Sequence, residues 1–535
     1  MRRSSLLGGL GLGLLTGIVV LSVLYLGERA AGLPYVPFVI FEWLTRILPG
    51  PLITAGIETM VSLITAIGIG PTSAVAKIAE MSLAVFLMLC GAAALGVVLA
   101  LVARRTSRLA LVGAAGGVLV WLCTLVALGQ LGRLGATPRG SLAWLFAILV
   151  VWGALLGYAI KRATTRDAAG GVPKGRRRFL ASFVAASAAL FVAAVGFGRA
   201  SGGRRPAPQA PGVGGGGPVG PEATSGPAAS PSPELLAKRI EPVKGTRPEL
   251  TPTDRFYRID INLVPPKLDA SAWRLRVDGL VTHPQELSLD DLRALPSTSQ
   301  VVTLECISNR LGGDLISTAV FTGVRLKDLL ARLGRKPEGK AVFLQSADQY
   351  FESVTPEDVD DERTLIVWAM NGEPLTAEHG FPLRIYIPNR YGMRQPKWIT
   401  HLEVVDRMRP GYWETRGWSN EAIPQTTSVI DAVGMSMMIG QAEALPLGGI
   451  AYSGARGISK VEVQVDDGPW VAAQLRTPPL SPLSWVQWRY DWPYAAGQHR
   501  FRVRAYDGTG KLQPVESRPP HPDGATGIHE ISAHV

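Results

Sequence analysis

Residues 302–310, VTLECISNR, place a thiol at the end of a short apolar run. Cys306 is followed by the polar residues Ser308, Asn309 and Arg310, and then by the glycine-containing stretch LGGDLIST. A cysteine thiolate is a soft ligand that suits a transition metal better than Mg²⁺ or Ca²⁺, and a neighbouring guanidinium could help to hold it deprotonated. The alternative is an inert buried thiol, the commoner state of a lone cysteine in an apolar strand.

The positions of the other cysteines and of the histidines limit which metal sites this chain could form. Cys90 and Cys123 lie inside apolar runs, so no disulfide framework is expected. The sequence has no C-x-x-C-H haem-attachment motif, and its seven histidines all lie at or beyond His283. Since the apolar half offers no histidine ligand, we expect no haem in this chain.

Basic residues gather in two segments downstream of Cys306. In residues 370–388, His379 stands five positions before Arg384, and in residues 389–399 arginines and a lysine surround Gly392. Converging on one pocket, these cations would suit a phosphate-bearing cofactor. Taken singly, each is more often a surface charge.

The first 200 residues predict a membrane region. Apolar runs of spanning length occur at about 6–26, 81–103, 109–129, 141–160 and 179–198. With the basic clusters between them in the cytoplasm, five crossings place the rest of the chain outside it. Residues 33–78 are expected to cross either not at all or twice, most simply as interfacial or re-entrant helices. The fifth run opens with KGRRRFL, which is similar to a twin-arginine export signal; the alternative is an ordinary basic flank.

Charge and composition separate this region from the remainder. Residues 1–205 hold 20 Lys and Arg against 5 Asp and Glu, whereas residues 206–535 hold 34 against 38. The positive charge therefore reports membrane topology and not nucleic-acid binding. We divide the chain into a transmembrane region at 1–198, a Gly/Pro-rich linker at 199–244, an α+β domain at 245–420 and an immunoglobulin-like β-sandwich at 421–535.

Five ordered segments carry a family resemblance: TPTDRFYRIDINLVPP, VTLECISNR, TAVFTGVRLKDLL, MNGEPLTAEHGFPLRIYIP and KWITHLEV. They resemble sulfite-oxidase-type molybdopterin oxidoreductases over residues 245–535. The resemblance implies molybdenum–molybdopterin as cofactor, with Cys306 as the metal's single protein ligand and Arg310 and Arg258 as further catalytic residues. It implies cofactor binding by Phe256, Tyr257, Arg258, Asp348, Ser353, His379, Arg384, Gly392, Arg394, Gln395 and Lys397.

Two departures leave the substrate open. Where animal and plant sulfite oxidases carry Arg-Asn-His, this chain has Ile259, Asp260 and Ile261, and their active-site tyrosine is replaced by Trp418, with Tyr412 nearby. The expected function is two-electron oxygen-atom transfer, sulfite-oxidase-like. One alternative is an S-oxide reductase of the methionine sulfoxide type, and a second is a non-catalytic membrane-tethered binding module.

The resemblance also bears on location and partners. A molybdopterin protein is loaded in the cytoplasm and exported folded, which favours the twin-arginine reading of the fifth run. We therefore expect a multi-pass protein of the cytoplasmic membrane with its catalytic domain on the extracytoplasmic side. The expected partners are a small-molecule substrate, a separate cytochrome or quinone-linked electron carrier, and a second copy bound through the C-terminal domain.

Overall fold

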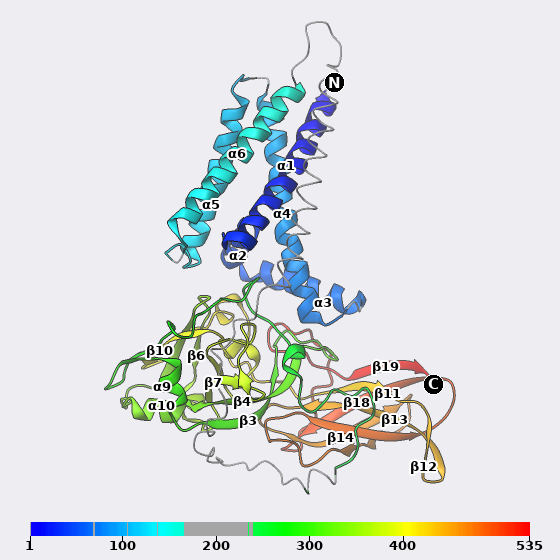
Figure 1. Ribbon diagram of the computed structural model, residues 1–535. Helices are drawn as coiled ribbons and strands as arrows, with labels where there is room; N and C mark the ends of the chain where they lie inside the picture. Colours follow the sequence, from blue (N-terminus) through cyan, green and yellow to red (C-terminus); the bar gives the residue numbers. More distant parts are fainter. Residues whose placement is uncertain (1, 68–69, 104, 136, 165–233, 235–238) are drawn as a thin grey trace, which may run out of the picture. The chain divides into compact units, whose positions relative to one another are not determined.

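The computed structural model describes residues 2–67, 70–103, 105–135, 137–164, 234 and 239–535 (Figure 1). The predicted fifth crossing, its arginine motif and nearly all of the linker lie outside these residues. The chain divides into two compact units, one made of Met1–Leu48 and Lys77–Pro218, the other of Pro49–Ala76 and Val219–Val535.

Long apolar helices make up the first unit. They are α1 (Arg2–Ala31), α2 (Val36–Ile47), most of α4 (Thr72–Val102), α5 (Leu109–Gln130) and α6 (Arg139–Thr164). Four stretches among the described residues are long and apolar enough to span a membrane: Leu6–Ala31, Thr72–Val102, Leu109–Gln130 and Arg139–Ala163. They contain the first four predicted runs. The helix α3 (Gly50–Ile67) belongs to the second unit and is shorter.

Glycines allow α5 and α6 to approach each other closely. A Cβ added at Gly113 would lie 2.0 Å from the Gly153 carbonyl oxygen, and one added at Gly153 would lie 2.1 Å from that of Gly113. Gly117 and Gly157 make equally close backbone contacts one turn further along each helix. This G-x-x-x-G pattern on both helices is typical of packing within a membrane.

Residues 239–426 of the second unit form two sheets with short helices. The strands are β1 (Leu275–Gly279), β2 (Gln285–Leu287), β3 (Thr298–Glu305), β4 (Ile316–Arg325), β5 (Ala341–Ser346), β6 (Phe351–Val354), β7 (Leu365–Met370), β8 (Glu373–Pro374), β9 (Arg384–Tyr386) and β10 (Ile399–Val405). The helices are η1 (Thr253–Arg255), α9 (Leu289–Arg293), α10 (Leu326–Arg332), α11 (Pro356–Asp360), η2 (Gly392–Arg394) and η3 (Glu414–Arg416). Ser288 and Asp291 form a capping box at the start of α9.

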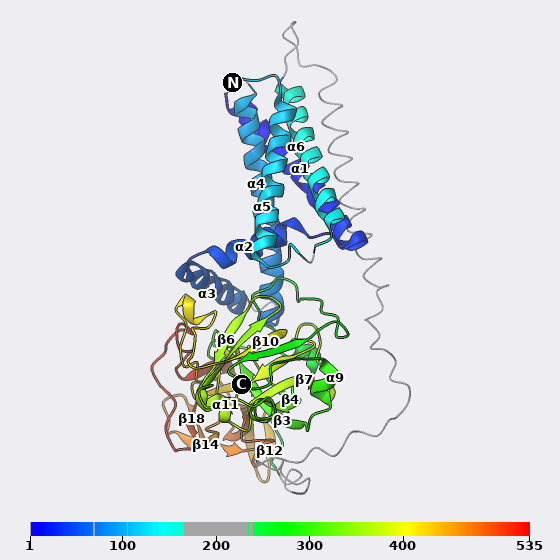
Figure 2. The same ribbon diagram turned by 90° about the vertical axis from the view of Figure 1, so that its left-hand side faces the viewer.

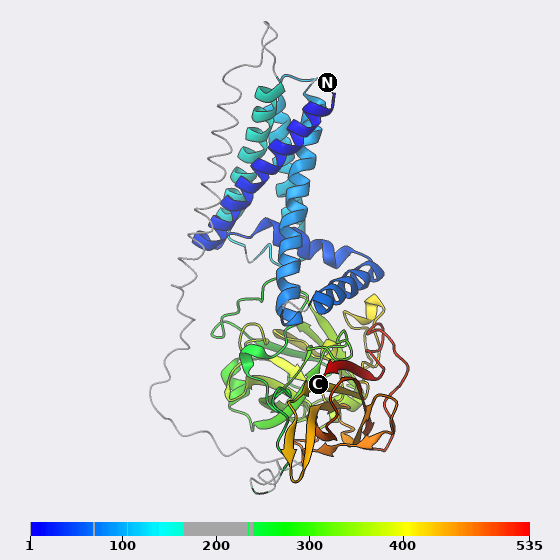
Figure 3. The same cartoon turned by 90° about the vertical axis from the view of Figure 1, so that its right-hand side faces the viewer.

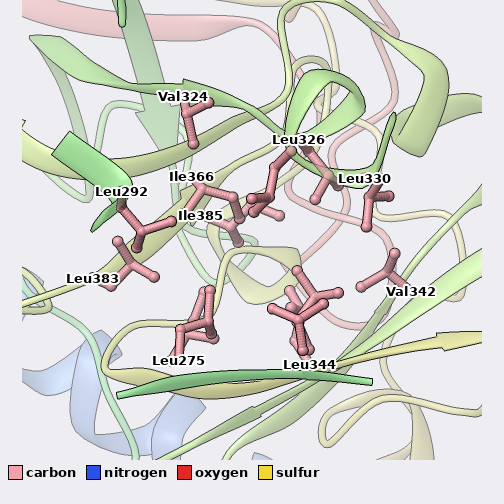
Figure 4. Packing of buried hydrophobic residues seen from close by; sticks show 14 of the residues in the cluster. Leu275, Leu292, Val324, Leu326, Leu330, Val342, Leu344, Ile366, Leu383 and Ile385 are labelled. Atoms are coloured by element: carbon pink, nitrogen blue, oxygen red, sulfur yellow. The ribbon is translucent and has the colours of Figure 1, made fainter. Parts of the chain in front are cut away.

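The two sheets have the strand orders β2-β1-β10-β5-β6 and β3-β4-β7-β8, with β9 also paired to β7. Strands β1 and β10 run parallel, and the remaining pairs are antiparallel. One apolar core joins the sheets: Leu275 and Leu344 from the first meet Val324 and Ile366 from the second (Figure 4). This core includes Ile385 of β9, and a second apolar cluster, which includes Val302 and Leu304, holds the end of β3 before Cys306.

Residues 427–535 form two further antiparallel sheets. Their strands are β11 (Thr427–Val433), β12 (Met437–Ile439), β13 (Ala442–Tyr452), β14 (Ile458–Val465), β15 (Val471–Ala472), β16 (Gln474–Leu475), β17 (Val486–Pro493), β18 (Gln498–Asp507) and β19 (His529–His534). The orders are β11-β13-β17-β16, with β12 beside β13, and β15-β14-β18-β19 (orange to red in Figure 3). Buried residues from both sheets, including Leu447, Trp488 and Phe501, share one core. The Asp467-Gly468 dipeptide lies in the turn of the β14–β15 hairpin.

Candidate functional site

Cys306 lies immediately after β3, in a loop that returns the chain to β4. Its amide donates to the Leu315 carbonyl at 2.9 Å, and its thiol lies 3.0 Å from the Ser308 hydroxyl. The side chain is buried, and burial raises the pKa of the thiol above its ordinary value. The protein alone therefore favours a protonated thiol, and a bound metal cation would supply the charge that converts it to a thiolate.

Asn309 closes the loop that carries Cys306. Its amide group donates to Glu305 at 2.9 Å, and its side-chain oxygen accepts from the Leu315 amide at 3.0 Å. Burial raises the pKa of Glu305 to about 7. Asn309 thus links the residue before Cys306 to the far side of the loop. Sequence reasoning missed Glu305, which stands directly before Cys306 and meets Asn309 only through the fold of the loop.

The sequence suggested that Arg310 could help to hold a Cys306 thiolate, but in the structure its guanidinium contacts another segment of the chain. Its guanidinium donates to the Glu58 carbonyl oxygen at 3.3 Å. It is not among the charges that shift the Cys306 pKa, and the neighbouring Glu305 raises that pKa further. Arg310 lines a narrow cavity together with Ser308 and Trp418.

Phe256 and Tyr257 follow η1 and extend from Cys306 toward the cationic residues. Their rings stack at 5.5 Å between centroids, and the Phe256 ring meets the His379 ring edge-on at 5.4 Å. Burial raises the Tyr257 pKa well above its ordinary value; charge on Cys306 adds to this shift and Arg384 opposes it. A Cβ added at Gly392 would lie 2.7 Å from the Tyr257 hydroxyl oxygen, so glycine is needed for Tyr257 to keep its position.

Three cationic side chains gather beside Phe256 and Tyr257. The Lys397 ammonium donates to Asp260 at 3.3 Å and to the Glu378 carbonyl at 3.0 Å, while Arg258 donates to Asp260 at 2.8 Å. The Lys397 pKa is lowered to about 8, chiefly by burial. The nearby Arg384 and Arg258 contribute to this lowering, and Asp260 opposes it. Burial also lowers the pKa of His379 to about 4, with Arg384 contributing.

This cluster has donors that no described residue satisfies. Arg384 is 3% exposed; it donates to the His379 carbonyl at 3.3 Å, but its Nε has no partner among the described residues. The Nη2 of Arg258 is buried and also lacks a partner there. Burial lowers the Arg384 pKa to about 10. Buried positive charge with unsatisfied donors is costly, and a phosphate group would offset both the charge and the missing hydrogen bonds. These residues therefore fit the terminal phosphate of a molybdopterin.

Four other predicted cofactor residues have partners within the protein. Asp348 accepts from the Asn262 side chain at 2.8 Å and from the Tyr350 amide at 3.1 Å. Ser353 donates to the Arg409 carbonyl at 2.7 Å. Gln395 donates to the carbonyls of Ile387 and Arg390 at 3.1 and 2.9 Å. Their roles in binding a cofactor stay predictions.

Arg394 is the fourth, and it is enclosed by carboxylates. Its Nη1 donates to Glu352 at 2.5 Å and to Glu414, and its Nη2 donates to the Asn420 carbonyl at 2.8 Å. All three charged side chains are buried, and burial raises the Glu352 pKa to about 7. The sequence predicted an arginine near the cofactor, but its acidic partners are 42 and 20 residues away, where no local pattern links them.

Replacing Arg394 should therefore destabilise the fold. We expect Arg394→Met to lower the free energy of unfolding by about 3–5 kcal/mol, because it leaves two buried carboxylates without their cation. Arg409→Met is the control: it removes the exposed Arg409–Glu403 pair and should cost about 1 kcal/mol or less. Urea unfolding of the full chain in detergent, followed by pulse proteolysis, measures both. Equal losses would contradict the structural role of Arg394.

Lys397 should make the stability of the cofactor-free protein depend on pH. Its folded pKa of about 8 lies below the ordinary value of 10.5. Between these values the unfolded chain binds a proton that the folded chain does not, so stability should rise with pH over this range, by about 3 kcal/mol at most. Lys397→Met should remove the rise, whereas a change at the exposed Lys267 should retain it. A rise that persists in Lys397→Met would contradict the assignment.

Comparison with known proteins places this site in a family. Residues 262–413 match the family profile of the oxidoreductase molybdopterin binding domain. The uncharacterized oxidoreductase YuiH of Bacillus subtilis (strain 168) is 33% identical over 179 residues, covering 33% of this chain and 87% of YuiH.

Two sulfite oxidases are also similar. That of Arabidopsis thaliana is 27% identical over 298 residues, which cover 45% of this chain and 76% of the plant protein. The mitochondrial sulfite oxidase of Homo sapiens is 29% identical over 334 residues, which cover 54% of this chain and 59% of the human protein. The geometry around Cys306 and the buried cations agrees with these likenesses, and the chain belongs to the sulfite-oxidase-type molybdopterin oxidoreductases.

Proposed function

We propose that the chain is a membrane-tethered oxidoreductase that carries out two-electron oxygen-atom transfer outside the cytoplasm, in the manner of a sulfite oxidase. One observation supports it most: Arg258, Arg384 and Lys397 form a buried positive cluster with unsatisfied donors, and the Phe256–Tyr257 pair extends from this cluster to the buried thiol of Cys306. A cofactor with a metal at one end and a phosphate at the other would satisfy both ends.

Each residue then has a task that follows from its surroundings. Cys306 would bind the metal through its thiolate, and Asn309 holds the loop that fixes the direction of the Sγ atom. Arg258, Arg384 and Lys397 would bind the phosphate. When bound, molybdenum–molybdopterin supplies the two-electron oxygen-atom chemistry, and the protein supplies binding, orientation and electrostatics.

The side chains beside Ser308 would handle the substrate. The indole N–H of Trp418 is buried and has no partner among the described residues, and it lines the same cavity as Arg310. Both groups donate hydrogen bonds, so they suit a substrate oxygen. Trp418 would thus take the place of the tyrosine found in animal and plant sulfite oxidases.

The proposal includes the membrane topology and domain plan. The four apolar helices support a multi-pass protein, and a twin-arginine-led fifth crossing would place residues 245–535 on the extracytoplasmic side. Residues 1–198 would be the membrane region, 199–244 the linker, 245–420 the cofactor domain and 421–535 an immunoglobulin-like domain that dimerises. Electrons would pass to or from a separate cytochrome or quinone-linked carrier.

A second candidate function is the reduction of S-oxides by the same site. Trp418 at the cavity favours it, because its indole N–H is a neutral donor and adds no positive charge that would attract an anionic substrate. The two functions share their cofactor and differ in substrate and direction.

The metal assignment can be tested by substitution of the cysteines. We expect Cys306→Ser to lose molybdenum, measured per purified chain after expression in a host that makes the cofactor, because a serine hydroxyl does not replace a soft thiolate. Cys123→Ser, on α5, is the matched control and should keep about one molybdenum per chain. Full molybdenum content in Cys306→Ser would overturn the assignment.

The direction of the reaction can be tested on the unmodified chain. Sulfite oxidation is assayed with ferricyanide as acceptor, and methionine sulfoxide reduction with reduced benzyl viologen as donor. The leading proposal predicts a kcat/KM for sulfite at least about tenfold above that for the sulfoxide. The reverse ratio would establish the second candidate, and turnover of neither would contradict both.

A further inference from the structure

The helix α3 lies between two candidate membrane spans in the sequence, yet it packs in the unit that contains Cys306. Figures 2 and 3 both show α3 beside the yellow segment that includes η3. At its start, a Cβ added at Gly50 would lie 2.7 Å from the Arg416 carbonyl oxygen. After its end, the Thr72 amide donates to Asp314 at 2.8 Å. Both ends of the segment are therefore in contact with residues 239–426.

One face of α3 is withdrawn from solvent. Thr54, Val61 and Ile64 are 7%, 6% and 6% exposed, and they recur at helical spacing. Leu52 and Leu63, on the other face, are 61% and 56% exposed. The helix therefore has a buried side and an open side, which provides matched positions for testing what the buried side does.

The buried side reaches the mouth of the site. Ile57, Glu58 and Val61 line the same narrow cavity as Ser308, Arg310 and Trp418. Ser308, which lines this cavity, has its hydroxyl 3.0 Å from the Cys306 sulfur, so a single side chain lies between the cavity and the thiol. The Glu58 carbonyl also accepts from Arg310 at 3.3 Å, which fixes the guanidinium against the helix.

We infer that α3 forms one wall of the substrate cavity and that Ile57 and Val61 limit the size of the substrates that reach Cys306; this rests on the proposed function of Cys306. Arg310 and Trp418 line one side of this cavity, whose exposed surface is apolar, and Ile57 and Val61 line the other. Only a compact substrate could reach Cys306 from this side while α3 stays in place.

A cavity-filling substitution tests this wall. We expect Val61→Trp in the full chain to lower kcat/KM about tenfold, in whichever of sulfite oxidation or methionine sulfoxide reduction the parent chain catalyses, with molybdenum content unchanged. Leu63→Trp introduces the same side chain on the open face of α3, and its kcat/KM should stay within about twofold of the parent value. Ile57→Ala should enlarge the cavity and raise the kcat/KM for methyl phenyl sulfoxide relative to dimethyl sulfoxide where the parent is a reductase. Equal effects of Val61→Trp and Leu63→Trp would overturn the inference.

A cross-linking measurement tests the position of the segment without any activity. In a chain carrying Cys90→Ser and Cys123→Ser, the pair Thr72→Cys and Asp314→Cys should form a disulfide, detected as a linked peptide by mass spectrometry. The control pair is Gly56→Cys and Asp314→Cys, since a Cβ at Gly56 meets no other residue within 4 Å, and it should stay unlinked. If neither pair forms a disulfide, the inference is overturned. A linked Thr72 pair in a protein that binds no molybdenum would instead contradict the proposed function alone.

Discussion

Uncompensated positive charge is the constraint on which this site depends. Arg258, Arg384 and Lys397 are held close together within the fold, and Asp260 neutralises only part of their charge. A cluster of this kind is costly to the empty protein and becomes favourable once an anion binds. Core packing must therefore hold the charges in place, and the apolar layer between the two sheets of residues 239–426 does so (Figure 4).

The same region contains a second buried ionic cluster, in which carboxylates neutralise the arginine. Around Arg394, two carboxylates and a backbone carbonyl satisfy one guanidinium, so this group is complete without a ligand. The contrast between Arg394 and Arg384 distinguishes an arginine that stabilises the fold from one that has a donor available for a ligand. Both are buried arginines in adjoining segments, but Arg384 alone of the two retains a buried nitrogen without a partner among the residues described.

Much of this arrangement could be predicted from the sequence, because it follows from local patterns. The capping box at Ser288, the hairpin at Asp467-Gly468 and the first four apolar helices all depend on residues that are near neighbours in the chain. The family of the chain also followed from short motifs. The pairing of Arg394 with Glu352 and Glu414, and the packing of α3 beside Ser308, depend on contacts between distant segments, for which one sequence carries no signal.

The protonated state of Cys306 has a consequence for how the protein is assembled. A buried thiol with a raised pKa is a poor nucleophile and resists oxidation. If Cys306 binds the metal as proposed, the folded chain would keep this thiol intact before loading. Loading would then displace a proton, so acid conditions should oppose it, and the energy of forming the metal–sulfur bond would have to exceed the cost of deprotonation. In the proposed role, burial would protect the ligand during biogenesis and make its final ionisation conditional on the arrival of the metal.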